Sequence, residues 1–407
     1  MTDQTLHALM IPEVLREVVQ HLDSDHKALY SASRVNRAWA EECLNLLWHS
    51  VSEDGATRLA SIPKQRRHFY ADRIRSWTLD MSPTDDQDQM CELDFPRLRR
   101  VDLWLTDDNS GCNHQLVPTL EEFQLFNNSK EPEYTLWELL SCCPNLRKLC
   151  VRSEPQINFD ELEDFLKEFS RLRALDLTSI SADNITDEVF CHLASLPLHE
   201  LRMRKPITSE MVDLACQRVG SGSLFPDLHY FEAGMEWCTA ARLLPAMTML
   251  RELRLNLVSS DTNHETFQAI GTLTELKDLD LRVAYQTERV LSREEVLAIG
   301  QLHNLRNLRI LGGRTLTIDK VVTDNDLVTL LSSFPKAEDI YIDAFKTTLI
   351  PSSATTALAM TSTQLRYYTF LAIWDLDSVE SSTLPLFAKL RIMHYQYLVN
   401  RDIPVEE

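Results

Sequence analysis

Features that mark many enzymes are scarce in this 407-residue chain. Its 9 glycines form no phosphate-cradling loop, no dinucleotide fingerprint and no nucleophile elbow around a serine. Its 12 histidines include no His-Glu-x-x-His pair, and Cys112 with His114 is one potential ligand pair without a second. Asp85, Asp86 and Asp88 lack the alternation and the glycine of a calcium loop. We therefore expect no catalytic residue, no bound metal and no cofactor.

Signals for export or membrane insertion are also missing. No apolar run reaches the roughly 18 residues that span a bilayer, and the first residues show no basic start followed by an apolar stretch. The 9 cysteines are odd in number and lack paired spacing, which favours reduced thiols over a disulfide framework. The expected location is the cytoplasm, the nucleus or both, with no membrane partner.

Basic residues are outnumbered, and the net charge is −20. Most of the excess, −17, falls in residues 101–407, whereas residues 61–100 carry +1. An acidic surface repels phosphate backbones, so nucleic acid is not an expected partner. One basic cluster lies where the helical segment should join the repeats. It is either a solvent-exposed connection or a patch for phosphate contact or nuclear import. Its residues are Lys64, Arg66, Arg67, His68, Arg73 and Arg75.

What the chain does contain is a repeat. A six-residue phrase, apolar-x-x-apolar-x-apolar, recurs thirteen times at a mean spacing of about 26 residues. Its fourth and sixth positions alternate with polar neighbours, so a short strand would bury them and leave the third, fifth and seventh positions facing outward. The copies begin at Ile74, Leu98, Leu120, Leu146, Leu172, Leu198, Leu228, Leu250, Leu276, Leu305, Ala337, Leu365 and Phe387.

Helical spacing appears between the strand phrases. Apolar residues recur three and four apart there, and many of these segments open on Thr, Ser or Asp, which cap helices. Helices are expected within residues 159–169, 185–196, 207–219, 293–302 and 325–334. Each helix would return the chain for the next parallel strand, and the units must stack because none covers its apolar face alone.

These repeats resemble the leucine-rich-repeat family. The resemblance implies an α/β solenoid, a horseshoe with parallel inner strands and outer helices. We assign residues 74–407 to this solenoid, including a C-terminal cap and a tail at Asp402 to Glu407, and residues 52–73 to a linker or joining helix.

The first 51 residues form a different, all-helical module. Pro12 suits the first turn of a helix, and an apolar stripe follows it through Leu15, Val18 and Leu22. Asp23 to His26 break this helix, and Asn36 can cap a later one. So short a module exposes more apolar surface than it can bury within itself, so the excess must meet a partner or the first repeats.

The module resembles the F-box, through Ile11-Pro12-Glu13-Val14-Leu15 and the run from Ser33 to Trp39, and Leu46 to Val51 resembles the extension of many fungal members. The resemblance implies docking on a Skp-type adaptor and, through it, a cullin. The implied adaptor-binding residues are Ile11, Pro12, Leu15, Val18, Leu22, Leu29, Val35 and Trp39. Packing inside the module is the alternative role for each, although Pro12 and Leu15 are favoured as contacts.

The outward strand positions should form the surface that binds a client protein. Aromatic and arginine side chains are common anchors of protein interfaces. The seventh positions contribute Trp104, Phe126, Arg152, Arg204 and Arg282, and the fifth positions contribute Arg202 and Arg254. The arginines would receive an acidic or phosphorylated segment. Alternatively, they pair with nearby carboxylates at Asp176, Glu200, Glu232, Glu252 and Asp280.

Together these patterns predict a non-enzymatic substrate receptor of a Skp-cullin-F-box ubiquitin ligase. Two alternatives stay open: an adaptor-binding protein without a degradative role, and a plain repeat scaffold whose helical module only caps the solenoid. Capping would bury Pro12 and Leu15 against Ile74 and Trp77, whereas adaptor binding requires that surface to be open.

Overall fold

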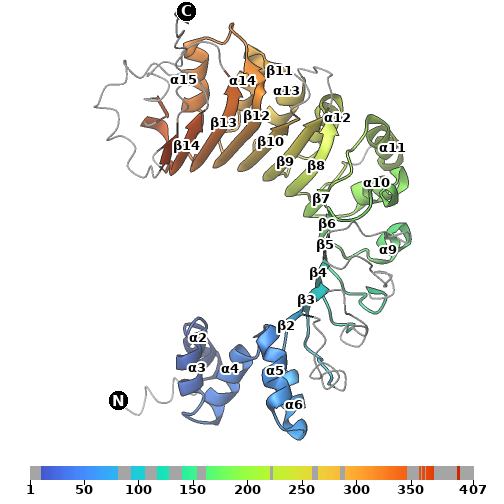
Figure 1. The fold of residues 1–407 in the computed structure, drawn as a ribbon, viewed down its shortest axis with the longest axis vertical. Coiled ribbons are helices and arrows are strands. Elements are labelled where there is room, and N and C mark those ends of the chain that lie inside the picture. The colour runs from blue at the N-terminus through green and yellow to red at the C-terminus, as the bar shows by residue number, and fades with distance from the viewer. Residues whose placement is uncertain are drawn as a thin grey trace, which may run out of the picture. The chain divides into compact units, whose positions relative to one another are not determined.

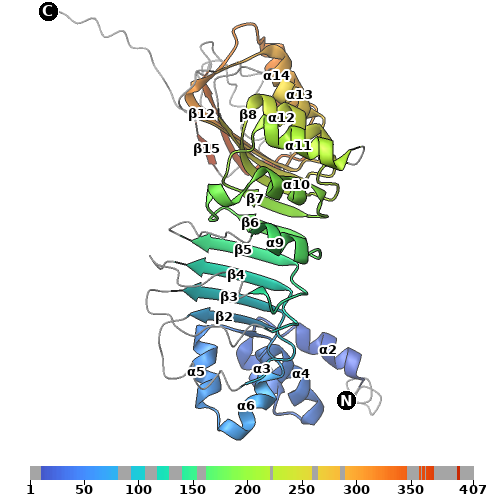
Figure 2. The same cartoon turned by 90° about the vertical axis from the view of Figure 1, so that its right-hand side faces the viewer.

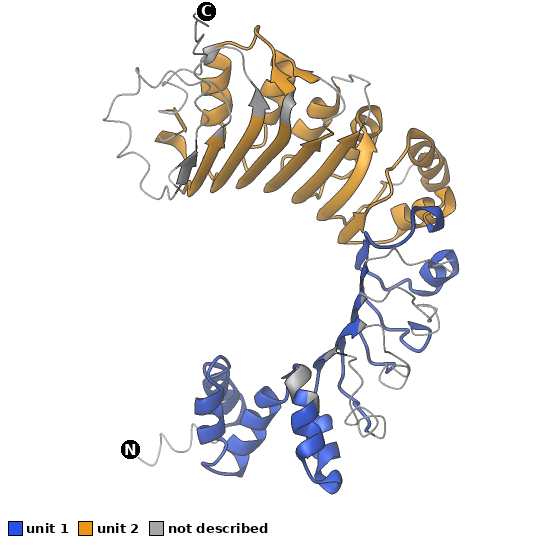
Figure 3. Cartoon of the chain, viewed as in Figure 1, with its two compact units in different colours: residues 1–184 blue, residues 185–407 orange. Residues whose placement is uncertain are grey.

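The structure is a computed structural model that divides into two compact units, residues 1–184 and 185–407 (Figure 3). Each unit is described by itself. The described residues are 11–80, 93–105, 117–127, 140–153, 162–220, 223–258, 265–284, 289–345, 357–358, 360–362, 364–370 and 392–394. The expected C-terminal tail at Asp402 to Glu407 lies outside them.

The first unit opens with three short helices packed around a small core. Pro12 occupies the first position of its helix, and the Asn36 side chain accepts the Trp39 amide N–H at 3.1 Å, as expected from the sequence. The core contains Leu15, Val19, Leu29 and Cys43. The helices are α2 (Pro12–Gln20), α3 (His26–Ala32) and α4 (Arg37–Leu47).

Two helices, not one, occupy the joining segment. They are α5 (Glu53–Ser61) and α6 (Lys64–Ala71), separated by a break at Pro63, whose ring excludes a continuous helix. Arg67 spans the break by donating to the carbonyl oxygens of Ile62 and Ala60 at 2.8 and 2.6 Å.

A parallel ladder follows in the first unit, with its strands in chain order (Figure 1). The third position of each repeat copy pairs with the third position of the next, as in Ser76 with Arg100 and Arg100 with Glu122. The strands are β1 (Ser50–Val51), β2 (Ser76–Asp80), β3 (Arg100–Leu105), β4 (Glu122–Asn127), β5 (Lys148–Ser153) and β6 (Ala174–Leu177), with α9 (Leu162–Glu168) between the last two.

The second unit continues the same strand-helix alternation and is also parallel. Its helices lie side by side on one face of its strands (Figure 2). Its strands are β7 (Glu200–Met203), β8 (Tyr230–Glu236), β9 (Glu252–Val258), β10 (Asp278–Val283), β11 (Arg289–Leu291), β12 (Asn307–Ile318), β13 (Asp339–Phe345), β14 (Tyr367–Phe370) and β15 (Ile392–His394). Its helices are α10 (Asp187–Ser195), α11 (Ser209–Val219), α12 (Trp237–Leu243), α13 (Glu265–Gly271), α14 (Arg293–Ile299) and α15 (Asp324–Ser332), with short 3-10 turns at Ala182–Asn184 in the first unit and Leu244–Ala246 in the second.

The expected caps hold these helices. Thr186 accepts the Val189 amide at 3.2 Å, and Ser292 and Thr323 each form a reciprocal capping box with the residue three positions later. Asp326, the acidic partner of Thr323, also receives two hydrogen bonds from Arg293 at 2.9 and 2.8 Å, which tie α14 to α15.

Alternation along each strand builds the core as predicted. Val101 and Leu103 at fourth and sixth positions are buried, while Trp104 at the seventh is 40% exposed. Leu253 and Leu255 are buried in the same way, and Arg254 between them is exposed. The expected leucine-rich-repeat architecture, with parallel strands and returning helices, is therefore confirmed.

Backbone hydrogen bonds align successive copies. The amides of the second and third positions both donate to the carbonyl oxygen of the second position in the preceding copy. In the first unit, Arg99 and Arg100 donate to the Arg75 carbonyl at 2.8 and 3.0 Å. In the second, Lys277 and Asp278 donate to the Arg251 carbonyl at the same distances. Each strand therefore starts from a fixed point on its neighbour.

The last predicted copy is out of phase. Tyr367, a third position, pairs with Ile392, which the phrase beginning at Phe387 would make a sixth position. By this register Ile392 is a third position, so the copy does not begin at Phe387 as the phrase predicted. Met393 is then a fourth position and not an outward seventh one.

No helix in the described part of the chain is long and apolar enough to cross a membrane.

Candidate binding surfaces

The eight adaptor-binding candidates fall into two groups. Ile11, Pro12 and Val35 are exposed. Leu15 and Leu29 are buried in the core of the helical module, and Leu22 and Trp39 pack against that core. Val18 is half-buried. Leu15 and Leu29 are 2% and 1% exposed, so they support the module's surface and do not form it.

Large apolar side chains remain uncovered on this module. Ile11 is 47% exposed, Val14 38% and Val35 63%, and Tyr30 is exposed as well. Ile11 is the N-cap residue of α2 and Val14 lies in its first turn, so both belong to the start of that helix. These side chains lie outside the core of the module and are therefore candidates for contact with a partner.

Two aromatic rings lie against each other on the strand face of the first unit, where the strand face means the third, fifth and seventh positions. Trp104 and Phe126 stack with centroids 4.2 Å apart and planes inclined by 10°. The Arg152 guanidinium carbon lies 5.8 Å from the Phe126 ring centroid. Three seventh positions of successive copies are thereby brought together.

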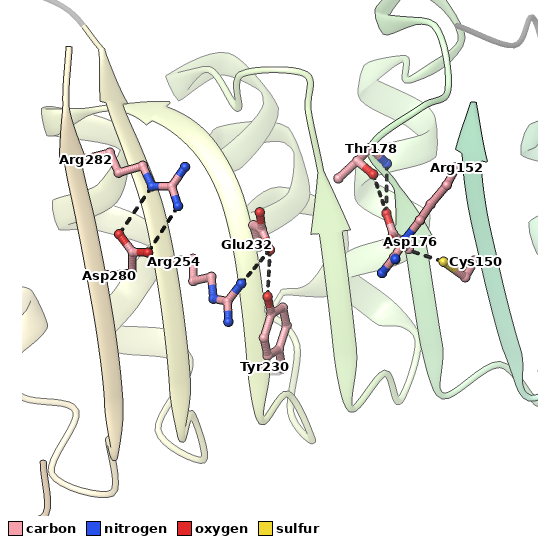
Figure 4. Close-up of polar contacts among 9 residues, drawn as sticks. All are labelled: Cys150, Arg152, Asp176, Thr178, Tyr230, Glu232, Arg254, Asp280 and Arg282. Carbon is pink, nitrogen blue, oxygen red and sulfur yellow. Dashed lines mark hydrogen bonds and ion pairs between the residues drawn. The ribbon is translucent and has the colours of Figure 1, made fainter. Parts of the chain in front are cut away.

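Arg152 also belongs to a polar cluster beside this stack (Figure 4). Its Nε lies 3.8 Å from Asp176, which accepts hydrogen bonds from the Thr178 hydroxyl at 2.6 Å and amide at 3.1 Å. The buried Cys150 thiol contacts the same carboxylate at 3.4 Å. Burial, with the nearby Asp176 charge, raises the pKa of Cys150 to about 11, so this thiol is protonated and unreactive at neutral pH.

On the strand face of the second unit, Tyr230 contacts two arginines and a glutamate. Its ring lies 4.5 Å from the Arg202 guanidinium carbon and 5.5 Å from that of Arg254. Its hydroxyl donates to Glu232 at 2.6 Å, and Glu232 also pairs with Arg254 at 3.9 Å (Figure 4). Burial and then Glu232 raise the pKa of Tyr230, so the phenol is neutral and serves as a donor.

The two interpretations of the arginines can be compared in this geometry. Arg152, Arg254 and Arg282 pair with Asp176, Glu232 and Asp280 respectively, as the alternative interpretation expected. Their side chains are nevertheless 50–56% exposed, so each keeps solvent-facing donors. Arg204 forms no ion pair among the described residues, and it is exposed.

The role of Tyr230 was missed at the sequence level. It is a third position flanked by fifth-position arginines in adjacent copies, Arg202 and Arg254. Cross-strand neighbours two positions apart are within reach of long side chains, and this is the signal that could have identified it.

Metal binding finds no support in the part of the chain that the structure describes, where no group of three His, Cys, Asp or Glu residues could hold an ion. Cys112, His114 and the acidic residues at 85, 86 and 88 lie outside that part. None of the seven cysteines within it forms a disulfide.

No protein-family model and no curated protein matches this sequence. Among solved structures, a leucine-rich-repeat protein of Leptospira interrogans is 14% identical, with a TM-score of 0.45 and coverage of 85% of this chain and 88% of that one. An internalin of Listeria monocytogenes is 11% identical, with a TM-score of 0.46 over 84% and 94%. Yeast Rad7, solved in complex with Elc1, is 15% identical, with a TM-score of 0.44 over 97% and 92%. At these values the function must be inferred from the chain's own residues.

Proposed function

We propose that this protein is the substrate receptor of a Skp-cullin-F-box ubiquitin ligase. Its helical module docks on a Skp-type adaptor, and its strand faces bind a client protein. Within the assembly it supplies position and not chemistry, because holding a client lysine near a ubiquitin-charged enzyme raises the effective concentration of the two.

The exposed apolar side chains of the helical module carry this proposal. Ile11, Val14, Tyr30 and Val35 are exposed although the module has a complete core of its own. Exposed apolar surface on a soluble fold costs free energy unless a partner covers it, and about 25 cal/mol is recovered per Å² on burial. A docking partner at this surface accounts for its composition.

The plain scaffold is the second candidate, and one observation favours it. β1 pairs with β2, so the end of the helical module continues the repeat ladder as a cap would. Pro12, however, is exposed, and Leu15 packs in the module's own core. Trp77 packs instead on Phe95, with centroids 4.5 Å apart. The exposure of Pro12 supports docking over capping, whereas Leu15 is covered by the module itself and favours neither.

The adaptor surface is tested by co-purification with a Skp-type adaptor. The double substitution Ile11→Asp with Val35→Asp should weaken binding at least about tenfold, because it places charges in an apolar contact. Val321→Asp is the matched control, since Val321 is 64% exposed in the second unit. Leu15→Asp is unsuitable because it would disrupt the core. Unchanged adaptor binding by the double variant would refute this docking surface.

The client surface is tested separately by crosslinking intact complexes. A photo-reactive residue in place of Trp104 should crosslink to client peptides, because that ring is 40% exposed beside Phe126. Client half-life with and without the receptor then distinguishes a degradative from a non-degradative role.

A further inference from the structure

Arginines gather at one rim of the first unit, at the ends of the strands where each strand begins. Second positions there carry Arg75, Arg99 and Arg147, and Arg97 precedes β3. All four are exposed in a protein whose net charge is −20. This concentration of one sign runs against the charge of the whole molecule.

These side chains line a hollow of about 430 Å³, which we call the basic groove; its walls are Arg75, Pro96, Arg97, Arg99, Thr119, Glu121, Asn145 and Arg147. Four guanidinium groups and one carboxylate line it, and Arg97 also pairs at 3.6 Å with Asp72, which is not among the lining residues. Glu121 pairs with both Arg99, at 3.1 Å, and Arg147, at 3.8 Å, so it neutralises at most one of them. The side chains of Arg99 and Arg147 stay 61% and 60% exposed.

A second hollow, of about 410 Å³, shares Arg75 and Arg97 with the basic groove and runs beside α2 and α4. Arg16, His49 and Arg73 line it, with Glu42 as an acidic member. Arg73 is 6% exposed, and its guanidinium group donates to the Phe69 carbonyl oxygen and pairs with Glu41 at 2.5 Å, so the accessible positive charge of this hollow comes from the other arginines.

The spacing of the charges suggests an elongated ligand. Arg75, Arg99 and Arg147 stand at the starts of β2, β3 and β5, and neighbouring strands lie about 4.8 Å apart. The arginines therefore form a row, interrupted at β4 by Glu121, and the adjoining hollow extends it. Guanidinium groups bind phosphate and carboxylate through paired hydrogen bonds.

We propose that the basic groove binds an extended peptide segment bearing several acidic groups, either phosphates or carboxylates. The site is separate from the strand face and from the exposed apolar residues of the helical module, and it does not depend on the receptor function proposed above. It places acidic recognition at the rim, where four arginines share the two carboxylates of Glu121 and Asp72, whereas on the strand face Arg152, Arg254 and Arg282 each have a carboxylate of their own.

Fluorescence anisotropy on the full chain tests this site with three labelled peptides of equal length: a Ser-Glu repeat, a phosphoserine-Gln repeat and a Ser-Gln repeat. Both acidic peptides should bind, with affinity falling as salt rises, and the Ser-Gln peptide should not bind. Which acidic peptide binds more tightly identifies phosphate or carboxylate as the preferred group.

Charge reversal then locates the binding. Arg99→Glu with Arg147→Glu should weaken it at least about tenfold. The matched control is Arg306→Glu with Arg366→Glu, because these second-position arginines flank Glu338 at 3.9 and 3.6 Å as Arg99 and Arg147 flank Glu121. The control should retain binding. Equal losses in both variants would mean general charge attraction and would overturn the assignment.

Glu121→Gln supplies a gain-of-binding test that misfolding cannot imitate. Removing the one carboxylate of the basic groove frees two arginines, so acidic peptides should bind several-fold more tightly. Unchanged or weaker binding would contradict the proposal. So would tighter binding of inositol hexakisphosphate or polyuridylate than of either acidic peptide.

Discussion

The carboxylate of Asp326 stabilises the contact between two neighbouring helices. It completes the capping box of α15 and accepts two hydrogen bonds from Arg293 of α14. Arg293 and then Thr323 hold the pKa of Asp326 well below its usual range, because each favours the charged form. One side chain therefore joins a helix start to the neighbouring helix.

Asp326→Asn should lower the free energy of unfolding by about 1–3 kcal/mol at neutral pH, since charge-assisted hydrogen bonds are lost. The pKa of Asp326 is lower in the folded state, so its contribution is complete above its unfolded pKa of about 3.9 and is lost as pH falls toward the folded value. Urea titrations of both proteins should give a constant difference from about pH 7 to pH 5 and a smaller one below about pH 4. A difference that grew on acidification would contradict this account.

The alternation along each strand predicts which residues face outward, but it does not predict how exposed their side chains are. Trp104, Arg152 and Arg254 lie on the strand face with exposed side chains, as the alternation requires. Tyr230 and Asp280 occupy outward positions too, yet they are buried to 7% and 8% exposure. Arginines from the same and neighbouring strands lie over them, and such cross-strand packing depends on side-chain conformation rather than on alternation.

At the scale of elements, local signals worked where they were strong. Caps at Thr186, Ser292 and Thr323 mark true helix starts, because a side-chain oxygen there replaces the missing backbone acceptor. Short strands without the phrase were missed: β1 has two residues and β11 has three. Their pairing is dictated by the neighbouring strand, which is tertiary information.

Removing one cap tests the contribution of local signals to stability. Thr186→Ala should lower the free energy of unfolding by about 1 kcal/mol, because the Val189 amide loses its acceptor. Thr186→Ser keeps the oxygen and should remain close to the wild type. Chemical denaturation followed by circular dichroism measures both, and equal stability of the alanine and serine variants would exclude the capping role.

For the molecule as a whole, the repeat phrase predicted that the strands stack in parallel. It did not predict that the chain divides into two compact units between residues 184 and 185. That division reflects contact density between elements, which no six-residue pattern encodes. Within a unit, each strand pairs with its immediate neighbours, so the effects of a lesion should spread only over short distances.

Leu281→Ala tests this locality. Leu281 is fully buried at the centre of β10, and its truncation should cost about 2–5 kcal/mol. Hydrogen exchange should accelerate in β9, β10 and β12 and stay near wild-type rates in β2, β3 and β4. Asn256→Ala, at an exposed position of β9, is the control. Uniform acceleration across both units would show global cooperativity instead.

The two amides that share one carbonyl at each strand start have a consequence for chain length. Because these hydrogen bonds align every copy with the preceding one, the register of the next strand does not depend on the length of the return segment. Third positions pair with third positions across the connection from β8 to β9 and across the longer one from β10 to β12 alike. Residues inserted into a return segment would then lengthen a surface loop and leave the pairing register of the following strands unchanged. Such segments are therefore suitable places to graft new recognition elements.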